Sequence, residues 1–257
     1  MTSRPNGGRG LLLFATGLRA LVGDLGVAAL TVAVFPFAFA SGLLGLRGLA
    51  DRVCVVWGGG ILRLFGVDVV LNGIENFPQG SGCLVLFNHQ SLFDIPVLYG
   101  TLRRTLRFGA KVELFRIPFF GPGMRAMGTL PIARANRSET LRTYKHAESM
   151  IAKGFSYALA PEGTRQATAA IGRFKTGPFI FAMGAQAPIV PAVIRGARNV
   201  LPKGSLLPNL GRWRRTVVLQ LLPAVPTRGL GPDDLNPLMD RVHAAMVDAF
   251  ARLPDLG

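Results

Sequence analysis

A histidine and an aspartate that could act together follow a hydrophobic segment of this sequence. Residues 83–87 are apolar, and after Asn88 the chain continues with His89 and, five positions later, Asp94. Because unperturbed imidazole has a pKa of about 6.5, His89 is suited to take a proton from a hydroxyl group at neutral pH. A nearby carboxylate would fix the imidazole tautomer and stabilise the imidazolium ion. No Gly-x-Ser-x-Gly segment occurs, so the pair favours direct attack by a substrate hydroxyl over a serine nucleophile.

A second polar segment follows another hydrophobic stretch. Residues 161–165 read Pro-Glu-Gly-Thr-Arg and come directly after the β-like residues 156–160. Proline and glycine favour a loop that exposes polar groups, and the guanidinium of Arg165 can bind a phosphate through two parallel hydrogen bonds. The alternative is an ordinary turn in which Glu162 and Arg165 form a surface ion pair. Each of the two motifs is weak evidence by itself.

The elements expected to position these motifs alternate between strands and helices. We expect strands at residues 67–71, 83–87, 106–109, 129–133, 156–160, 189–194 and 217–222, and helices at residues 91–99, 136–153 and 235–253. This alternation predicts an α/β fold with a mostly parallel central sheet flanked by helices. Open sheets of this kind bind ligands at the carboxyl ends of their strands, where His89 is expected to lie.

The first 66 residues have a different character. Residues 25–46 carry no charge, and their number is close to the roughly 20 residues that cross a hydrocarbon core. Pro36 would kink such a helix or help it return to the same side. Residues 49–65 predict an interfacial helix with Trp57 as its anchor. We therefore expect residues 1–66 to form a membrane-anchoring helical pair and residues 67–257 to form the α/β domain. Arginines flank the apolar run on both sides and leave its topology open.

Composition supports a membrane-associated protein. Hydrophobic residues make up 49% of the chain and charged residues only 17%, against about 25% charged residues in ordinary soluble domains. The net charge of +15 suits an anionic partner, namely nucleic acid, an anionic lipid surface or a phosphorylated substrate. The apolar N-terminal region favours lipid over nucleic acid. A basic membrane- or nucleic-acid-binding protein without enzymatic activity is the alternative. The three histidines and two cysteines lack metal-ligand spacing.

Four blocks in this order resemble the glycerolipid acyltransferase family, which includes the 1-acylglycerol-3-phosphate acyltransferases. They are the Asn-His-x-x-x-x-Asp motif, a middle block at residues 111–134, the Pro-Glu-Gly-Thr-Arg motif, and the Ile-Val-Pro-Ala-Val-Ile strand at residues 189–194. The segment Arg-Phe-Lys-x-Gly at residues 173–177 also fits, and the resemblance covers residues 71–196. Ala160 is a departure, because the family often has phenylalanine there, and this puts local packing in doubt.

The resemblance implies that a fatty acyl group passes from acyl-CoA or acyl-acyl carrier protein to the free hydroxyl of 1-acylglycerol-3-phosphate, giving phosphatidic acid. It implies that His89 is the general base and Asp94 its orienting partner. The residues that it implies for binding the acceptor's glycerol phosphate are Lys111, Arg134, Glu162, Gly163, Thr164, Arg165 and Lys175. No metal or bound cofactor is implied. Another lysolipid, such as a lyso-ornithine lipid, is the alternative acceptor.

The same resemblance implies a location and partners. Both thioester donors are cytoplasmic, so we expect a bacterial inner-membrane protein whose site faces the cytoplasm. Its expected partners are the lysophospholipid acceptor, the thioester donor and an anionic membrane surface, without nucleic acid. Two further segments have more than one interpretation. Residues 117–120 suit an acyl tunnel, a loop that dips into lipid, or a core loop, and the basic residues 203–215 around Trp213 suit an interfacial patch or a solvated surface.

Overall fold

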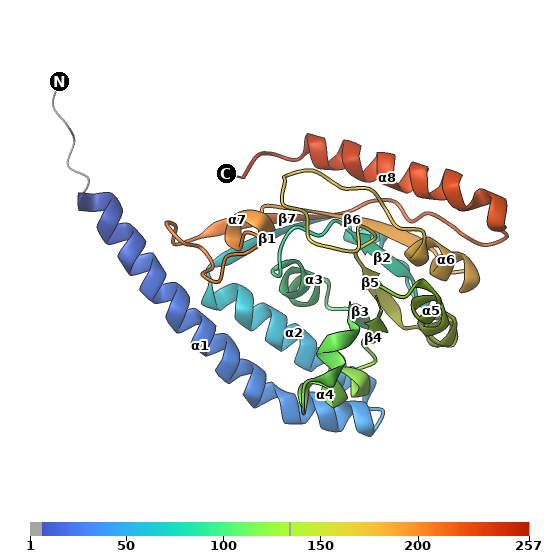
Figure 1. Ribbon diagram of the computed structural model, residues 1–257, viewed down its shortest axis with the longest axis horizontal. Coiled ribbons are helices and arrows are strands. Elements are labelled where there is room, and N and C mark those ends of the chain that lie inside the picture. The colour runs from blue at the N-terminus through green and yellow to red at the C-terminus, as the bar shows by residue number, and fades with distance from the viewer. Residues whose placement is uncertain (1–6, 134, 257) are drawn as a thin grey trace.

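The computed structural model describes residues 7–133 and 135–256, and within them one mixed sheet forms the centre of the molecule (Figure 1). Its strands are β1 (Val67–Asn72), β2 (Leu84–Phe87), β3 (Leu106–Lys111), β4 (Leu130–Ile132), β5 (Ser156–Leu159), β6 (Ile189–Arg195) and β7 (Arg215–Leu221). They are ordered β1-β7-β6-β2-β5-β3-β4. Only the β6–β7 pair among these neighbours is antiparallel. The expectation of a mostly parallel sheet is therefore confirmed.

Helices cover both faces of this sheet. They are α1 (Gly7–Leu43), α2 (Arg47–Leu64), α3 (Asp94–Leu102), α4 (Phe120–Ala126), α5 (Arg137–Ala152), α6 (Gly177–Gly184), α7 (Ala197–Val200) and α8 (Leu235–Arg252). The side chains of Val85 and Phe87 pack with α2 and α3, whereas Leu84 and Leu86 pack with α5, α6 and α8. Every residue of β2 is buried, as expected for a parallel strand covered on both faces.

The N-terminal region forms two helices, as the sequence predicted. Of the apolar run expected at residues 25–46, residues 25–43 are the second half of the longer helix α1, which has 37 residues, continues past Pro36 and ends at Leu43. Among the described residues, α1 is the one helix that is long and apolar enough to cross a membrane. The prediction that Trp57 is an interfacial anchor is wrong, because its Nε1 donates to Thr31 Oγ1 at 3.0 Å and its ring packs edge-on against Tyr99.

A buried ion pair attaches α2 to the sheet. Arg107 of β3 donates from Nη1 to Asp51 Oδ1 at 2.7 Å, and Thr105 donates to the other oxygen of Asp51 at 2.6 Å. The arginine side chain is almost completely buried. Removing one member of such a pair would leave an uncompensated charge inside the protein. Helix α2 is thereby fixed to the α/β domain.

The helix boundaries follow local signals where such signals exist. Asn136 caps α5 by accepting a hydrogen bond from the Glu139 N–H at 3.1 Å, which the sequence predicted from the Asn-x-x-Glu spacing. Helix α6 was not predicted, because its eight residues Gly177–Gly184 are almost all apolar and show no helical periodicity. This helix, which the sequence pattern did not predict, contributes residues to the candidate site.

One buried side chain replaces a strand hydrogen-bond pair at the end of β2. Asn88 is fully buried. Its Nδ2 donates to the Ile194 carbonyl at 2.9 Å, and its Oδ1 accepts from the Ile194 N–H at 2.7 Å. The amide thus extends the contact between β2 and β6 by one residue, immediately before His89.

Replacing Asn88 by alanine should strongly destabilise the protein. The Asn88→Ala change leaves a buried N–H and a buried carbonyl of Ile194 without partners, which should lower the free energy of unfolding by about 2–5 kcal/mol. Urea denaturation followed by circular dichroism measures this loss. The matched control is Asn199→Ala, which removes a single, half-buried hydrogen bond to Leu256. An equal loss for the two variants would contradict the role assigned to Asn88.

Candidate active site

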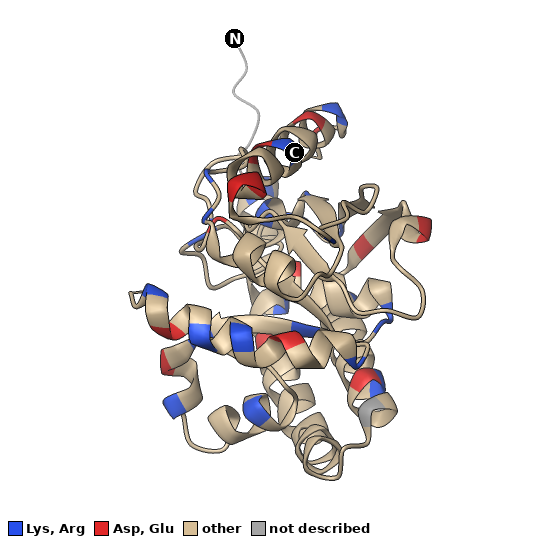
Figure 2. Ribbon diagram, turned by 90° about the vertical axis from the view of Figure 1, so that its right-hand side faces the viewer, with Lys and Arg blue, Asp and Glu red and all other residues tan. Residues whose placement is uncertain are grey.

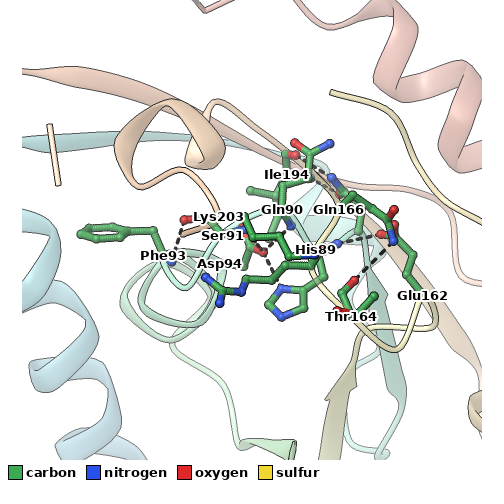
Figure 3. Close-up of polar contacts among 12 residues, drawn as sticks. His89, Gln90, Ser91, Phe93, Asp94, Glu162, Thr164, Gln166, Ile194 and Lys203 are labelled. Carbon is green, nitrogen blue, oxygen red and sulfur yellow. Dashed lines mark hydrogen bonds and ion pairs between the residues drawn. The ribbon is translucent and has the colours of Figure 1, made fainter. Parts of the chain in front are cut away.

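A tight turn after β2 brings His89 and Asp94 together (Figure 3). His89 Nδ1 lies 2.8 Å from Asp94 Oδ2. The same carboxylate oxygen accepts hydrogen bonds from the backbone N–H groups of Gln90 at 2.9 Å and Ser91 at 3.0 Å. Asp94 is fully buried at the start of α3. Three donors therefore fix the carboxylate, and the carboxylate fixes the ring.

This arrangement leaves one ring nitrogen of His89 free for chemistry. A carboxylate that accepts from Nδ1–H selects the tautomer in which Nε2 carries the lone pair. The His89 side chain is 13% exposed and lines a cavity, so Nε2 can be reached by a substrate. The ring of Phe87 packs edge-on against the imidazole at 5.7 Å between centroids. This geometry would suit a general base for a hydroxyl group.

A second carboxylate holds the backbone of His89. Glu162 Oε1 accepts from the His89 N–H at 2.8 Å, and Glu162 Oε2 accepts from the Gly172 N–H at 2.9 Å. The His89 carbonyl in turn accepts from the Gln166 N–H at 2.8 Å. Glu162 is only 4% exposed. Burial raises the pKa of its carboxyl, while the two backbone donors act in the opposite direction.

The loop that follows β5 is tied to the last helix of the chain. A Cβ atom at Gly172 would lie 2.8 Å from Gln166 Cδ and 2.9 Å from Glu162 Oε2, so a larger residue would displace these side chains. The Gly172 carbonyl lies 3.2 Å from Nε2 of His243 on α8, and the His243 ring packs edge-on against Phe174. Through this loop, α8 supports the turn that carries His89.

The cavity beside His89 has a volume of about 400 Å³ and two kinds of wall. Its apolar wall comprises Phe87, Ile95, Phe108, Ile132, Leu141, Tyr144 and Leu159. Its polar edge includes Arg137, Thr140, Lys175 and Thr176, near the start of α5 and α6. An aliphatic chain with an anionic group suits such a cavity in size and polarity.

Sequence comparisons match the chain to a known family. Residues 68–195 match the family described as Acyltransferase. The chain is 31% identical over 234 residues to 1-acyl-sn-glycerol-3-phosphate acyltransferase alpha from Bos taurus, covering 85% of this chain and 80% of the relative. The chain belongs to this acyltransferase family.

Other relatives extend the comparison. The acyltransferase is 29% identical over 202 residues to 1-acyl-sn-glycerol-3-phosphate acyltransferase from Haemophilus influenzae, covering 77% of this chain and 81% of the relative. Its match to the chloroplastic relative BAT2 from Brassica napus, at 34% identity, spans 52% of this chain and 39% of that protein. The crystal structure of PlsC from Thermotoga maritima, titled a 1-acyl-sn-glycerophosphate (LPA) acyltransferase, has a TM-score of 0.70 at 23% identity. That likeness covers 92% of this chain and 99% of PlsC, and it supports the fold.

Some of the residues expected to bind substrate lie at the cavity of the acyltransferase. Glu162, Gly163, Thr164 and Lys175 line it together with His89. Gly163 has a φ of +74°, which glycine adopts without strain. The Lys175 N–H donates to the Pro161 carbonyl at 2.7 Å, so the backbone on either side of the cavity mouth is connected.

Other expected residues lie elsewhere. Among the described residues, Lys111 and Arg165 are outside the cavity lining. Lys111 Nζ lies 3.3 Å from Glu113 in an exposed ion pair, and Arg165 is half-buried with its carbonyl accepting from Lys203 Nζ at 2.9 Å. Arg134, also predicted to bind phosphate, lies outside the described residues.

Glu162 also lines the cavity, but its contacts favour another role than the one that the resemblance implied. Both of its oxygens already accept backbone N–H groups, and an anionic side chain would repel a phosphate. We interpret Glu162 as a residue that positions the His89 peptide, in place of a direct contact with glycerol phosphate. The sequence did not indicate that Arg137, Thr140 and Tyr144 belong to the site. Their pattern indicated only where a helix begins and which of its sides is buried.

Replacing Glu162 by glutamine tests the positioning role. The amide has one accepting oxygen, so its NH₂ group would face either the His89 or the Gly172 N–H, and the turn should shift. Because displacements near 1 Å can cost about 10²-fold, we expect kcat to fall about 10- to 100-fold while the KM for the acceptor changes little. Steady-state kinetics beside the exposed control Glu75→Gln measures this. A raised KM with an unchanged kcat would instead support contact with the acceptor.

Proposed function

We propose that this acyltransferase moves a fatty acyl group from acyl-CoA or acyl-acyl carrier protein to the free hydroxyl of 1-acylglycerol-3-phosphate. The product is phosphatidic acid. The observation that carries the proposal is the 2.8 Å contact between His89 Nδ1 and Asp94 Oδ2 beside a cavity with an apolar wall and a cationic edge. The names of the bovine and Haemophilus influenzae relatives support this choice of acceptor.

The proposed reaction needs no nucleophile from the protein. His89 Nε2 takes the proton of the acceptor hydroxyl while its oxygen attacks the thioester carbonyl. The C–S bond then breaks, and the imidazolium returns the proton to the departing thiolate. Asp94 stabilises the positive charge that forms on His89. General base catalysis of this kind accelerates a reaction by about 10²- to 10⁴-fold.

The cationic residues around the cavity support a phosphate-bearing substrate. Arg137 and Lys175 line the cavity, and Arg165 follows the lining residue Thr164 in the chain. Arginine binds phosphate oxygens in pairs, whereas lysine acts as a point charge. We assign these side chains to the acceptor phosphate, with the apolar wall left to an aliphatic chain.

The proposed setting is the surface of a membrane with anionic lipids. The exposed apolar side chains of α1 and the net charge of +15 support it. Since both thioester donors are cytoplasmic, we propose that the site faces the cytoplasm, in a bacterium at the inner membrane.

The general base is tested by removing the imidazole. Purified protein in detergent should form phosphatidic acid from oleoyl-CoA and lysophosphatidic acid, and His89→Ala should reduce kcat by about 10²-fold or more. The control is His146→Ala, which alters an exposed histidine on α5. Near-normal transfer by His89→Ala would disprove the mechanism. If wild-type protein makes no product, acyl-acyl carrier protein replaces oleoyl-CoA as donor.

The acceptor is tested with a panel of lysolipids. We expect the highest kcat/KM for lysophosphatidic acid, compared with lysophosphatidylcholine and a lyso-ornithine lipid. Lys175→Met keeps the aliphatic stem but removes the charge. This change should lower kcat/KM for lysophosphatidic acid about tenfold or more, the loss expected for one charged hydrogen bond. A preference for the lyso-ornithine lipid would overturn the assigned acceptor and leave the general-base assignment unaffected.

A further inference from the structure

The loop between β5 and α6 is closed on itself. We call residues 160–176 the β5–α6 loop. Its ends are joined by a hydrogen bond from the Lys175 N–H to the Pro161 carbonyl at 2.7 Å. Its interior is spanned by Glu162, whose Oε2 accepts from the Gly172 N–H at 2.9 Å. Compact loops whose ends lie close together are frequently functional. Because Gly172 is bonded to the carboxylate, a shift of Gly172 would move Glu162.

The β5–α6 loop is bound to the turn that carries the proposed general base. Glu162 Oε1 accepts from the His89 N–H at 2.8 Å, and the Gln166 N–H donates to the His89 carbonyl at 2.8 Å. The next residue of the turn, Gln90, is buried, and its Nε2 lies 3.5 Å from the Thr168 carbonyl oxygen. His89 is therefore held by this loop at both its N–H and its carbonyl, and a displaced loop would displace the imidazole.

His243 of α8 contacts this loop at two places. Its Nε2 lies 3.2 Å from the Gly172 carbonyl oxygen. A carbonyl oxygen can only accept a hydrogen bond, so Nε2 carries the proton in this contact. The His243 ring packs edge-on against Phe174 at 4.7 Å between centroids, and Phe174 stacks on Phe179 of α6. One side chain thus supplies both a polar and an apolar contact to the second half of the loop.

Helix α8 is a firm support for this side chain. Its buried residues recur at helical spacing and pack in one cluster with Leu84 and Leu86 of β2: Leu238, Val242, Met246, Ala249 and Phe250. Figure 2 shows α8 at the top of the molecule, with charged residues of both signs. His243 is half-buried beside the apolar stripe. A hydrogen-bond donor on a packed helix holds its partner more precisely than a donor on a loop.

From these contacts we propose that His243 is a positioning residue for acyl transfer, and that it acts on His89 through Glu162. The Nε2–H of His243 fixes the Gly172 peptide, and the Gly172 N–H fixes the Glu162 carboxylate. Glu162 then fixes the His89 N–H. Among the described residues, those that line the cavity do not include His243, so its effect passes through this chain of contacts. The inference rests on the proposed function, in which His89 is the general base.

Two variants separate the donor of His243 from its ring. His243→Phe keeps a ring against Phe174 but has no donor, and its kcat should fall about tenfold with an unchanged acceptor KM, less than the roughly 10²-fold cost of a 1 Å displacement. His243→Gln places an NH₂ donor near the position of Nε2 and should restore kcat to within about twofold of wild type. The matched control is His146→Phe, the same change at an exposed histidine on α5. An unchanged kcat for His243→Phe, or an equal loss for both His243 variants, would overturn the inference.

A double-mutant cycle tests whether His243 acts through Glu162. Two changes along one chain of contacts do not add, because the first already releases what the second would release. The double variant of His243→Phe with Glu162→Gln should therefore be at most about twofold slower in kcat than Glu162→Gln alone. Losses that multiply would mean that His243 acts independently of Glu162, and that result would contradict the proposed route.

Hydrogen exchange tests the same contacts without relying on activity. Mass spectrometry should show faster amide exchange in peptides that cover residues 161–176 and 88–94 of His243→Phe, and near wild-type exchange in His243→Gln. Unchanged exchange in both segments, or faster exchange throughout the protein, would overturn the inference. If wild-type protein transfers no acyl group from either thioester donor, the proposed function is wrong, whereas the exchange rates still decide whether His243 holds the turn that carries His89.

Discussion

Two buried carboxylates hold the turn that carries His89, and the chemistry proposed for the cavity depends on them. Asp94 and Glu162 are removed from water, which is costly for a negative charge unless donors surround it. The donors come almost entirely from the backbone of the turn itself and from Gly172. Both oxygens of Glu162 and Asp94 Oδ2 accept hydrogen bonds, whereas Asp94 Oδ1 is buried without a partner among the described residues. The bonds to Asp94 Oδ2 fix the direction of the imidazole.

The sheet determines where this turn lies. Strand β2 is paired in parallel with β5 on one side and with β6 on the other. The pairing of Leu86 with Leu159 brings the loop after β5, including Glu162, to the residues after β2. On the other side, Asn88 joins β2 to Ile194 of β6. His89 and Glu162, which are 73 positions apart in the chain, thus meet beyond the carboxyl ends of two neighbouring parallel strands.

The sequence supported some of these conclusions and not others, for physical reasons. The pairing of His89 with Asp94 is local, so the spacing and the turn could be predicted together, and the alternating pattern was enough for the sheet. The role of Glu162 depends on its distances from the backbone N–H groups of His89 and Gly172. The spacing of residues along the sequence does not reveal these distances. Trp57 was misplaced for the same reason, since an amphipathic ring suits a helix interface as well as a membrane interface.

Close packing connects helix α1 to the turn that carries His89. Helix α1 packs on α2, and α2 packs on α3, whose first residue is Asp94. A Cβ atom on Gly58 of α2 would lie 2.8 Å from the Gly100 nitrogen of α3, so glycines bring these two helices to their closest approach. Helices in such contact cannot slide or separate without losing buried surface. The position of His89 relative to α1 is therefore set by the fold.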